Sequence, residues 1–307
     1  MGTELSTVNS VHQQSKRFRR FQIAPYLFIL PSLVGVLAFL LLPAAAIMVI
    51  SFLKWNMISS PQFVGFSNYA KLIHSSTAIH SLLVTAYYVL LNIPLQTILA
   101  ILLAILLNRK SRWMAVFRPI FVLPWLLTPV AVAATWLWLM NPGYGYFDHI
   151  LTVLFGISPA WVSSKQLAMP AIALVNIWEF TGYNTLFFLA GLQGIPTHLY
   201  EAAEIDGAGP VRRFFTITLP LLQPTTMFVL ITSVIGSFQV FGTIYVMTQG
   251  GPGNATNAIV YEIYQEAFQF FHMGYASALA VILFLGILVV TLLQFLYFRR
   301  HTTYDFS

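Results

Sequence analysis

The chain has 307 residues, of which 58% are hydrophobic and only 8% are charged, and its mean hydropathy is +0.78. Soluble domains carry about 25% charged residues, so the composition excludes an ordinary water-soluble fold and predicts an all-α integral membrane protein. No cysteine is present, which excludes disulfides and thiolate metal sites. The sequence also lacks a G-x-x-x-x-G-K-[ST] loop, so we expect no ATP bound to this chain through such a loop.

Six stretches are apolar and long enough to cross roughly 30 Å of hydrocarbon, which takes about 20 helical residues. In chain order they are residues 21–53, 81–107, 117–139, 167–192, 222–247 and 275–298. The first contains Pro31 and Pro43, which favour kinks or helix ends. Its apolar part is too long for a cleavable signal, so we expect a retained membrane helix.

Basic residues gather at alternate ends of these spans, which predicts that both termini are cytoplasmic. Twelve of the 15 are on the predicted cytoplasmic side: Lys16, Arg17, Arg19, Arg20, Arg109, Lys110, Arg112, Arg118, Arg212, Arg213, Arg299 and Arg300. Lys54, Lys71 and Lys165 are on the other side. We therefore expect a cytoplasmic arm at 1–20, a six-span domain at 21–300 and a cytoplasmic tail at 301–307. The net charge of +6 then reflects membrane topology, and no nucleic-acid partner is expected.

A polar segment, EAAEIDGAGPVRRFFTITLP, separates the fourth and fifth predicted spans. Thr197 is a suitable N-cap for a short helix that runs to about Asp206, and Gly207 suits a left-handed stop after it. Pro210 fits the first turn of a second helix, and Pro220 is expected to bound that helix. A cytoplasmic helix–turn–helix of this kind is a docking surface for a partner.

The spacing of this segment resembles one known family. The three residues Glu201, Ala202 and Ala203 are followed after three residues by Gly207, and after nine more by Ile-x-Leu-Pro. This spacing is similar to the EAA loop of binding-protein-dependent ABC importer permeases. The resemblance implies that residues 197–220 form coupling helices that dock on a separate ATPase subunit. The residues implied in this coupling are Glu201, Ala202, Ala203, Asp206 and Gly207. It also implies that ATP and Mg²⁺ are bound by that ATPase and that this chain holds no cofactor.

Other segments resemble the carbohydrate branch of these importers, and in particular the larger maltose-type membrane subunit. They are FVGFSNY at 63–69, LAGLQGIP at 189–196, TQGGPGNAT at 248–256, YQEAF at 264–268 and GYASALA at 274–280. The chain departs from the maltose protein in one respect. Only about 28 residues separate the first two predicted spans, so the large periplasmic insertion is absent.

Polar residues inside the spans are candidates for ligand contacts. Glu179 is the one acid well inside a predicted span, where a charge costs roughly 2.5–3.5 kcal/mol. Asn176, Glu179 and Tyr183 share one helix face, and Phe180 and Trp178 could stack on a sugar ring. The alternative is that these polar groups bind neighbouring helices.

In the fifth span, Ser233 and Ser237 share a face, and Gly236 and Gly242 thin the helix. The resemblance implies that sugar contacts come from the spans on either side of the coupling loop. The predicted substrate-binding residues are Asn176, Glu179, Phe180, Tyr183, Ser233, Gly236, Ser237 and Gln239. No catalytic or metal-binding residue is predicted, because the seven histidines are scattered and no HExxH motif occurs.

The predicted function is that of a multi-pass permease subunit of a bacterial cytoplasmic (inner) membrane ABC importer for a sugar or oligosaccharide. Expected partners are a second related permease subunit, two cytoplasmic ATPase subunits, an extracytoplasmic sugar-binding protein and membrane lipid. Two other transport functions remain open: an ion-coupled secondary transporter, and a permease for another polar solute such as glycerol phosphate. A membrane-embedded enzyme is disfavoured because no metal-ligand or Ser/His constellation is evident.

Overall fold

A computed structural model describes residues 23–109 and 111–301 of the chain, which divides into two compact units, Met1–Ala46 and Ile47–Ser307. The predicted arm at 1–20 and all but the first residue of the predicted tail at 301–307 lie outside the described residues. The described residues are mostly helical, in agreement with the predicted fold class.

The first helical stretch combines two α-helices with a π-helical turn between them. Helix α1 spans Ile23–Val36, the turn η1 spans Leu37–Leu41, and α2 spans Leu42–Ile50. Pro31 lies inside α1, whereas Pro43 follows the wide π-turn. Proline has no N–H to donate, so the regular i to i−4 hydrogen-bond pattern is interrupted at Pro43, and a π-turn lies just before this position.

A short non-helical segment follows. Strand β1 (Leu53–Lys54) pairs antiparallel with β2 (Gln62–Phe63), and Leu53 lies opposite Phe63. Helix α3 (Ser67–His74) supports the pair, because Asn68 Nδ2 donates to the carbonyl oxygens of Ser51 and Leu53 at 2.8 and 2.9 Å. Within the described ranges this hairpin is the one departure from the predicted all-α fold.

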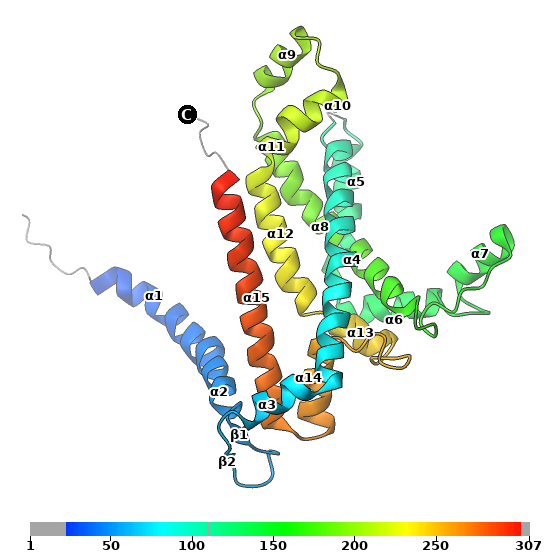
Figure 1. The fold of residues 1–307 in the computed structure, drawn as a ribbon. Coiled ribbons are helices and arrows are strands. Elements are labelled where there is room, and N and C mark those ends of the chain that lie inside the picture. The colour runs from blue at the N-terminus through cyan, green and yellow to red at the C-terminus, as the bar shows by residue number, and fades with distance from the viewer. Residues whose placement is uncertain (1–22, 110, 302–307) are drawn as a thin grey trace, which may run out of the picture. The chain divides into compact units, whose positions relative to one another are not determined.

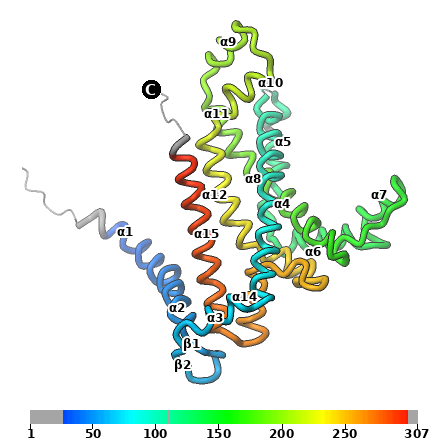
Figure 2. The backbone as a smooth tube through the Cα atoms, in the orientation of Figure 1, coloured from blue at the N-terminus to red at the C-terminus, as the bar shows by residue number. Residues whose placement is uncertain are grey.

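Four long helices build the second unit. They are α4 (Ser76–Leu107), α8 (Ala168–Gln193), α12 (Gln223–Phe238) and α15 (Met273–His301). They run side by side in Figures 1 and 2. Helix α8 packs most extensively on α4, and α12 packs on both α4 and α15. Apolar helices suit the interior of a membrane because each helix satisfies its own backbone hydrogen bonds.

Small residues let these helices approach closely. Ala100 and Ala104 on α4 are fully buried beside Phe188 and Leu192 of α8. Gly182 of α8 lies against the backbone of Phe121, and an added Cβ would clash with the Phe121 carbonyl group. Packing at small residues is a main source of helix association in membranes.

The third predicted span is not a single straight helix. It comprises α5 (Met114–Val122), the 3₁₀-helix η2 (Leu123–Leu126) and α6 (Pro129–Leu139), and its two halves are bent by 97°. The bend occurs where Pro129 forces Thr128 into an extended conformation, with ψ of 137°. The Thr128 hydroxyl then caps α6 by accepting a hydrogen bond from the Ala131 N–H at 3.4 Å.

By length and apolarity, four helices within the described ranges could cross a membrane, or five if the bent pair forms one span. Helix α8 has 26 residues, or about 39 Å of length. It is nevertheless absent from that apolar set, since it carries Asn176, Glu179 and Asn184. Helices therefore occupy all six predicted positions, while six membrane crossings remain a prediction.

The polar loop folds as two short helices, as predicted. Helix α9 spans Thr197–Ile205, and α10 spans Pro210–Arg213. Gly207 has a φ of +74°, which confirms the left-handed stop, and Pro210 is the first residue of α10. The predicted N-cap is wrong by one residue: the extended backbone, with a ψ of 131°, is at Pro196, so Pro196 occupies the cap position and Thr197 is already helical.

The predicted helix end at Pro220 is also wrong. A π-turn η3 (Phe214–Thr218) is followed by α11 (Leu219–Leu221), which leads through Leu222 into α12. Pro220 is in the first turn of α11, where its missing N–H is tolerated. The second loop helix is consequently almost continuous with the following long helix.

The end of the second unit opposite α9 is built from short helices and turns (Figure 1). They are α13 (Gly242–Met247), α14 (Ile259–Tyr264) and the π-turn η4 (Gln265–Gln269). The glycine-rich loop between α13 and α14 is held by Thr256, whose hydroxyl donates to the Gly251 carbonyl at 2.6 Å. Helix α7 (Tyr146–Phe155) lies in the connection from α6 to α8.

Candidate functional site

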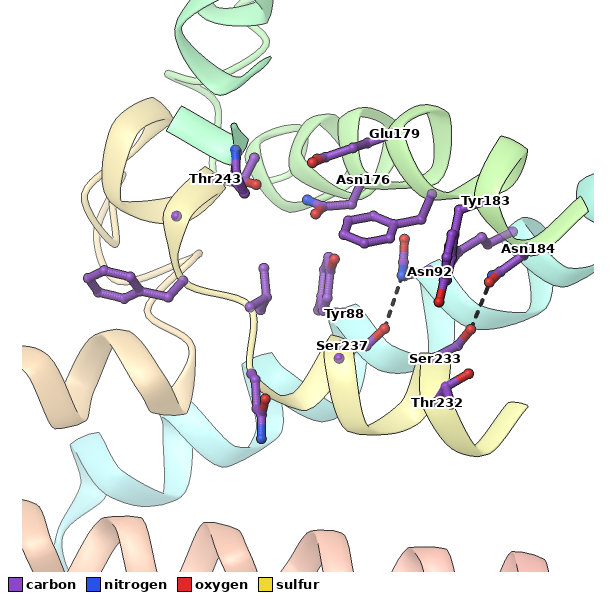
Figure 3. Close-up of a pocket in the computed structure, with 18 residues that line it drawn as sticks. Tyr88, Asn92, Asn176, Glu179, Tyr183, Asn184, Thr232, Ser233, Ser237 and Thr243 are labelled. Carbon is purple, nitrogen blue, oxygen red and sulfur yellow. Dashed lines mark hydrogen bonds between the residues drawn. The ribbon is translucent and has the colours of Figure 1, made fainter. Parts of the chain in front are cut away.

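A cavity of about 350 Å³ lies among α4, α8, α12 and the chain between α12 and α13 (Figure 3). This volume is at the lower end of the usual range for small-molecule sites. All eight predicted substrate-binding residues line it: Asn176, Glu179, Phe180, Tyr183, Ser233, Gly236, Ser237 and Gln239. The fold thus brings together residues from either side of the polar loop, and their part in ligand binding stays a prediction.

Helix α8 contributes the acidic group of the cavity wall. The Glu179 side chain is only 1% exposed, and its Oε2 atom has no hydrogen-bond partner in the protein. Asn176 Nδ2 donates to the Ile172 carbonyl of its own helix at 3.0 Å. Buried polar atoms without partners are rare, so the free carboxyl oxygen is a candidate for a ligand contact.

The serines of α12 connect helices and line the cavity at the same time. Ser237 Oγ accepts a hydrogen bond from Asn92 Nδ2 of α4 at 3.1 Å. Ser233 Oγ accepts one from Asn184 Nδ2 of α8 at 3.2 Å. Both bonds are drawn in Figure 3. The two alternatives from the sequence, helix–helix contact and ligand contact, are therefore compatible at these positions.

Helix α12 ends beside the cavity rather than continuing straight to residue 247. It stops at Phe238, and α13 starts at Gly242, so the backbone of Gln239, Val240 and Phe241 turns along the cavity wall. Irregular backbone at membrane depth is tolerated where it lines a cavity. A Cβ added to Gly236 would meet no atom within 4 Å.

Sequence reasoning missed the contribution of α4. Tyr88, Asn92 and Gln96 all line the cavity, and Asn92 Nδ2 donates to Gln96 Oε1 at 3.2 Å. The Asn92 Oδ1 atom has no partner. These residues recur every four positions along α4 and so share one face of the helix, and this spacing was the signal that could have found them.

Trp178 does not line the cavity, so the prediction that it stacks on a ligand there is wrong. It lines a separate apolar groove and makes an edge contact with Trp136, with ring centroids 5.4 Å apart. The reason is helix geometry, because adjacent residues are about 100° apart around the axis. Tyr183 does line the cavity and stacks on Trp125 at 4.3 Å.

The loop helices form a second candidate site with an exposed outer face. Glu201, Ala202, Asp206 and Gly207 are exposed, and Ala203 is half-buried. Apolar side chains are exposed with them: Ile205 is 87% exposed and Val211 is 71% exposed, and Phe215 is exposed as well. Exposed apolar groups within a polar rim are typical of a protein-interaction surface.

The inner face of the same loop is firmly attached to the long helices. The Tyr200 hydroxyl lies 2.9 Å from Thr218 Oγ1 and so connects α9 to the π-turn η3. Leu199, Phe214 and Ile217 pack against the core formed by the ends of α4, α8 and α12. A displacement of the loop would therefore be passed to these helices.

A family model and two similar sequences identify membrane components of transport systems. The family model described as "Binding-protein-dependent transport system inner membrane component" matches residues 73–302. The sn-glycerol-3-phosphate transport system permease protein of Yersinia enterocolitica is 35% identical, over 92% of this chain and 96% of that protein. The trehalose/maltose transport system permease protein of Thermococcus litoralis is 38% identical, over 87% and 90% of the two chains.

Solved structures show the same fold. A chain from a bacterial ABC transporter involved in the import of the acidic polysaccharide alginate matches with a TM-score of 0.80 and 24% identity. The match covers 91% of this chain and 96% of that one. A chain from a bacterial alginate ABC transporter in complex with an alginate pentasaccharide-bound periplasmic protein matches with a TM-score of 0.81 and 24% identity.

Proposed function

The chain belongs to the family of binding-protein-dependent transport system inner membrane components, and we propose that it is a permease subunit of an ATP-driven importer for a sugar or oligosaccharide. The single observation that carries this proposal is the connection between its two candidate sites. Helix α8 leads into α9, and α10 leads almost without a break into α12. Both α8 and α12 line the cavity, so the exposed loop and the ligand share the same helices.

This connection supports alternating access driven from outside the membrane. Closure of an ATPase against Glu201, Ile205 and Val211 would move α9 and α10 as one body. The attached ends of α8 and α12 would then shift and open or close the cavity between them. Rigid-body motion of packed helices is a common means of switching between two states. ATP and Mg²⁺ are bound and used by the partner ATPase, and this chain acts without catalytic residues of its own.

The full assembly we propose has a second related permease subunit, two cytoplasmic ATPase subunits and an extracytoplasmic sugar-binding protein. The Yersinia and Thermococcus relatives are named as permease proteins of transport systems, which supports an assembly of several chains. We further propose six membrane crossings in the bacterial inner membrane, both termini cytoplasmic, and residues 197–220 on the cytoplasmic side. Charge supports this orientation, since Arg212 and Arg213 are in the loop and positive residues favour the cytoplasm.

The test is transport by the purified chain in liposomes, with and without its partner permease, ATPase and binding protein. We expect sugar uptake only when all components and ATP are present. Uptake by this chain alone, driven by an ion gradient, would instead support a secondary transporter. Uptake of sn-glycerol-3-phosphate but of no sugar by the complete assembly would assign the chain to the glycerol phosphate alternative.

A further inference from the structure

The cavity wall carries one acid and no basic residue, in a chain whose relatives are named for both glycerol phosphate and trehalose or maltose. Resting on the proposed function, we propose that Glu179 makes the cavity selective for uncharged, hydroxyl-rich ligands and excludes phosphorylated and uronic-acid ligands. The names of similar proteins leave this choice open, since one names glycerol phosphate and another names trehalose and maltose.

The first support is the composition of the cavity wall. Eighteen residues of the described chain line it, and they include one acid and no lysine, arginine or histidine. Sites that bind phosphates or carboxylates typically supply arginine or lysine for charge-assisted hydrogen bonds. Apart from Glu179, the polar side chains of the wall are amides and hydroxyls, which both donate and accept. Such groups match the hydroxyls of a neutral sugar.

The second support is the pair of unpaired acceptors. Glu179 Oε2 and Asn92 Oδ1 are buried, and neither has a hydrogen-bond partner in the protein. They belong to α8 and α4, which face the same cavity (Figure 3). An unpaired buried acceptor is costly, so a ligand that offers O–H groups to both atoms gains affinity. An ionised phosphate or carboxylate group offers further acceptors and no donor.

The third support is the placement of the acid among neutral neighbours. Glu179 makes no salt bridge among the described residues, and the cavity side of α12 presents Ser233, Gly236 and Ser237. No cation in the cavity wall therefore offsets a carboxylate at this position. A ligand carrying a negative charge would meet a like charge wherever Glu179 is ionised, and it would find no cation in the wall in either state, which is unfavourable in a buried site.

The experiment measures ligand binding to the assembled permease–ATPase complex in nanodiscs without the binding protein, so that the readout comes from the membrane cavity. The probes are matched sets that share one sugar skeleton: trehalose with trehalose 6-phosphate, and neutral mono- to pentasaccharides with their uronic-acid counterparts. Variants are Glu179→Gln and Glu179→Lys. Glu266→Gln is the matched control, since Glu266 is an acid outside the cavity.

We expect the unmodified complex to bind a neutral probe at least about tenfold more tightly than its charged counterpart, as expected for like-charge exclusion. Glu179→Gln should keep neutral binding and reduce this ratio several-fold, and Glu179→Lys should reverse the preference. Glu266→Gln should leave the ratio unchanged. Equal binding of neutral and anionic members, an unchanged ratio in Glu179→Gln, or failure of every neutral probe to bind would overturn the inference.

The outcome is separable from that of the proposed function. ATP-dependent uptake of any probe by the complete assembly supports the importer, whichever charge is preferred. If uptake is ATP-dependent but anionic probes compete equally, the selectivity inference fails and the importer stands. If no probe is taken up in an ATP-dependent way while neutral probes still bind preferentially, the importer fails and the cavity selectivity stands.

Discussion

Glu204 of α9 and Arg213 of α10 form a salt bridge that connects the two loop helices, with 3.0 Å between Glu204 Oε2 and Arg213 Nη1. The Glu204 side chain is 73% exposed, whereas that of Arg213 is 24% exposed. The bridge spans the turn at Gly207 and lies next to the exposed face of the loop.

Removing this bridge should have little effect on stability. Exposed ion pairs contribute about 0–1 kcal/mol, so Glu204→Gln should lower the free energy of unfolding by less than about 1 kcal/mol. The measurement is a thermal or denaturant unfolding curve of the purified protein in detergent. The exchange variant Glu204→Arg with Arg213→Glu serves as the control that keeps a pair. A loss of several kcal/mol would show that the loop depends on the bridge for its fold.

Changes at the outer face of the loop should uncouple transport from ATP hydrolysis. Glu201→Lys reverses an exposed charge, and Gly207→Asp adds a charged side chain at a φ of +74°, a conformation that glycine adopts most readily. We expect both variants to insert and assemble, while sugar uptake per ATP hydrolysed falls at least about tenfold, which corresponds to about 1.4 kcal/mol of lost coupling.

The matched control for the glycine is Gly209→Ala. Gly209 has a φ of −64°, and an added Cβ would meet no atom within 4 Å. It should therefore keep full coupling. The role assigned to the loop would be refuted if Glu201→Lys and Gly207→Asp both transported sugar at the normal rate.

Substitutions at Gly182 and Gly236 should distinguish a glycine needed for helix packing from a glycine that leaves space for a ligand. Gly182→Ala forces a Cβ into the Phe121 carbonyl group, so it should destabilise the protein by at least about 1–3 kcal/mol. Gly236→Ala enters open space within the cavity and should leave the unfolding curve unchanged, while Gly236→Leu should block ligand binding by filling that space. Unfolding curves and ligand binding are measured on the same preparations, and similar stability losses at both sites would contradict this assignment.

Acidic pH should favour the folded state through Glu262 of α14, which is outside the candidate spans. Burial raises the pKa of Glu262, and nearby Glu266 adds to the rise, while the 2.6 Å hydrogen bond from Asn257 opposes it. Because the folded-state pKa lies above the ordinary value of 4.5, this contribution to stability is full below that value. It is lost as the pH rises through the folded-state pKa.

Unfolding curves of the unmodified chain and of Glu262→Gln, recorded from acidic to neutral pH, check this linkage. The glutamine variant does not titrate at this position. We therefore expect the unmodified chain to lose stability relative to the variant as the pH rises. A difference that does not change with pH, or one that changes in the opposite direction, would rule out the buried carboxyl group as the cause.

The two loop helices were predictable from sequence because their signals are local. Gly207 adopts the left-handed conformation that it was expected to adopt, and Pro210 begins the second helix, since both depend on the steric properties of single residues. The errors at Thr197 and Pro220 have a common cause. In both cases the helix boundary depends on the backbone conformation around a neighbouring proline. The π-turn η3, which precedes Pro220, has no clear signature in the sequence.

The eight predicted substrate-binding residues line one cavity because helical spacing places polar side chains on one face, and because the family resemblance indicated the two spans that carry them. The contribution of Tyr88, Asn92 and Gln96 was missed, although their spacing was visible. Which face of α4 meets α8 depends on contacts between residues far apart in the chain, such as Thr185 and Ala100, which are 85 positions apart. Trp178 shows the converse error, since proximity in sequence to Glu179 did not mean a shared face.

Composition and pattern alone determined that this chain is a helical membrane protein, where its apolar helices lie, and that its polar loop resembles the coupling segment of an importer. These properties follow from the length, hydropathy and local conformational preferences of single segments. Tertiary structure alone decided that α4 completes the cavity, that the third apolar stretch bends by 97°, and that Glu179 is buried with an unpaired oxygen. These depend on which helix faces pack together, because burial and hydrogen bonding are set jointly by residues far apart in the chain.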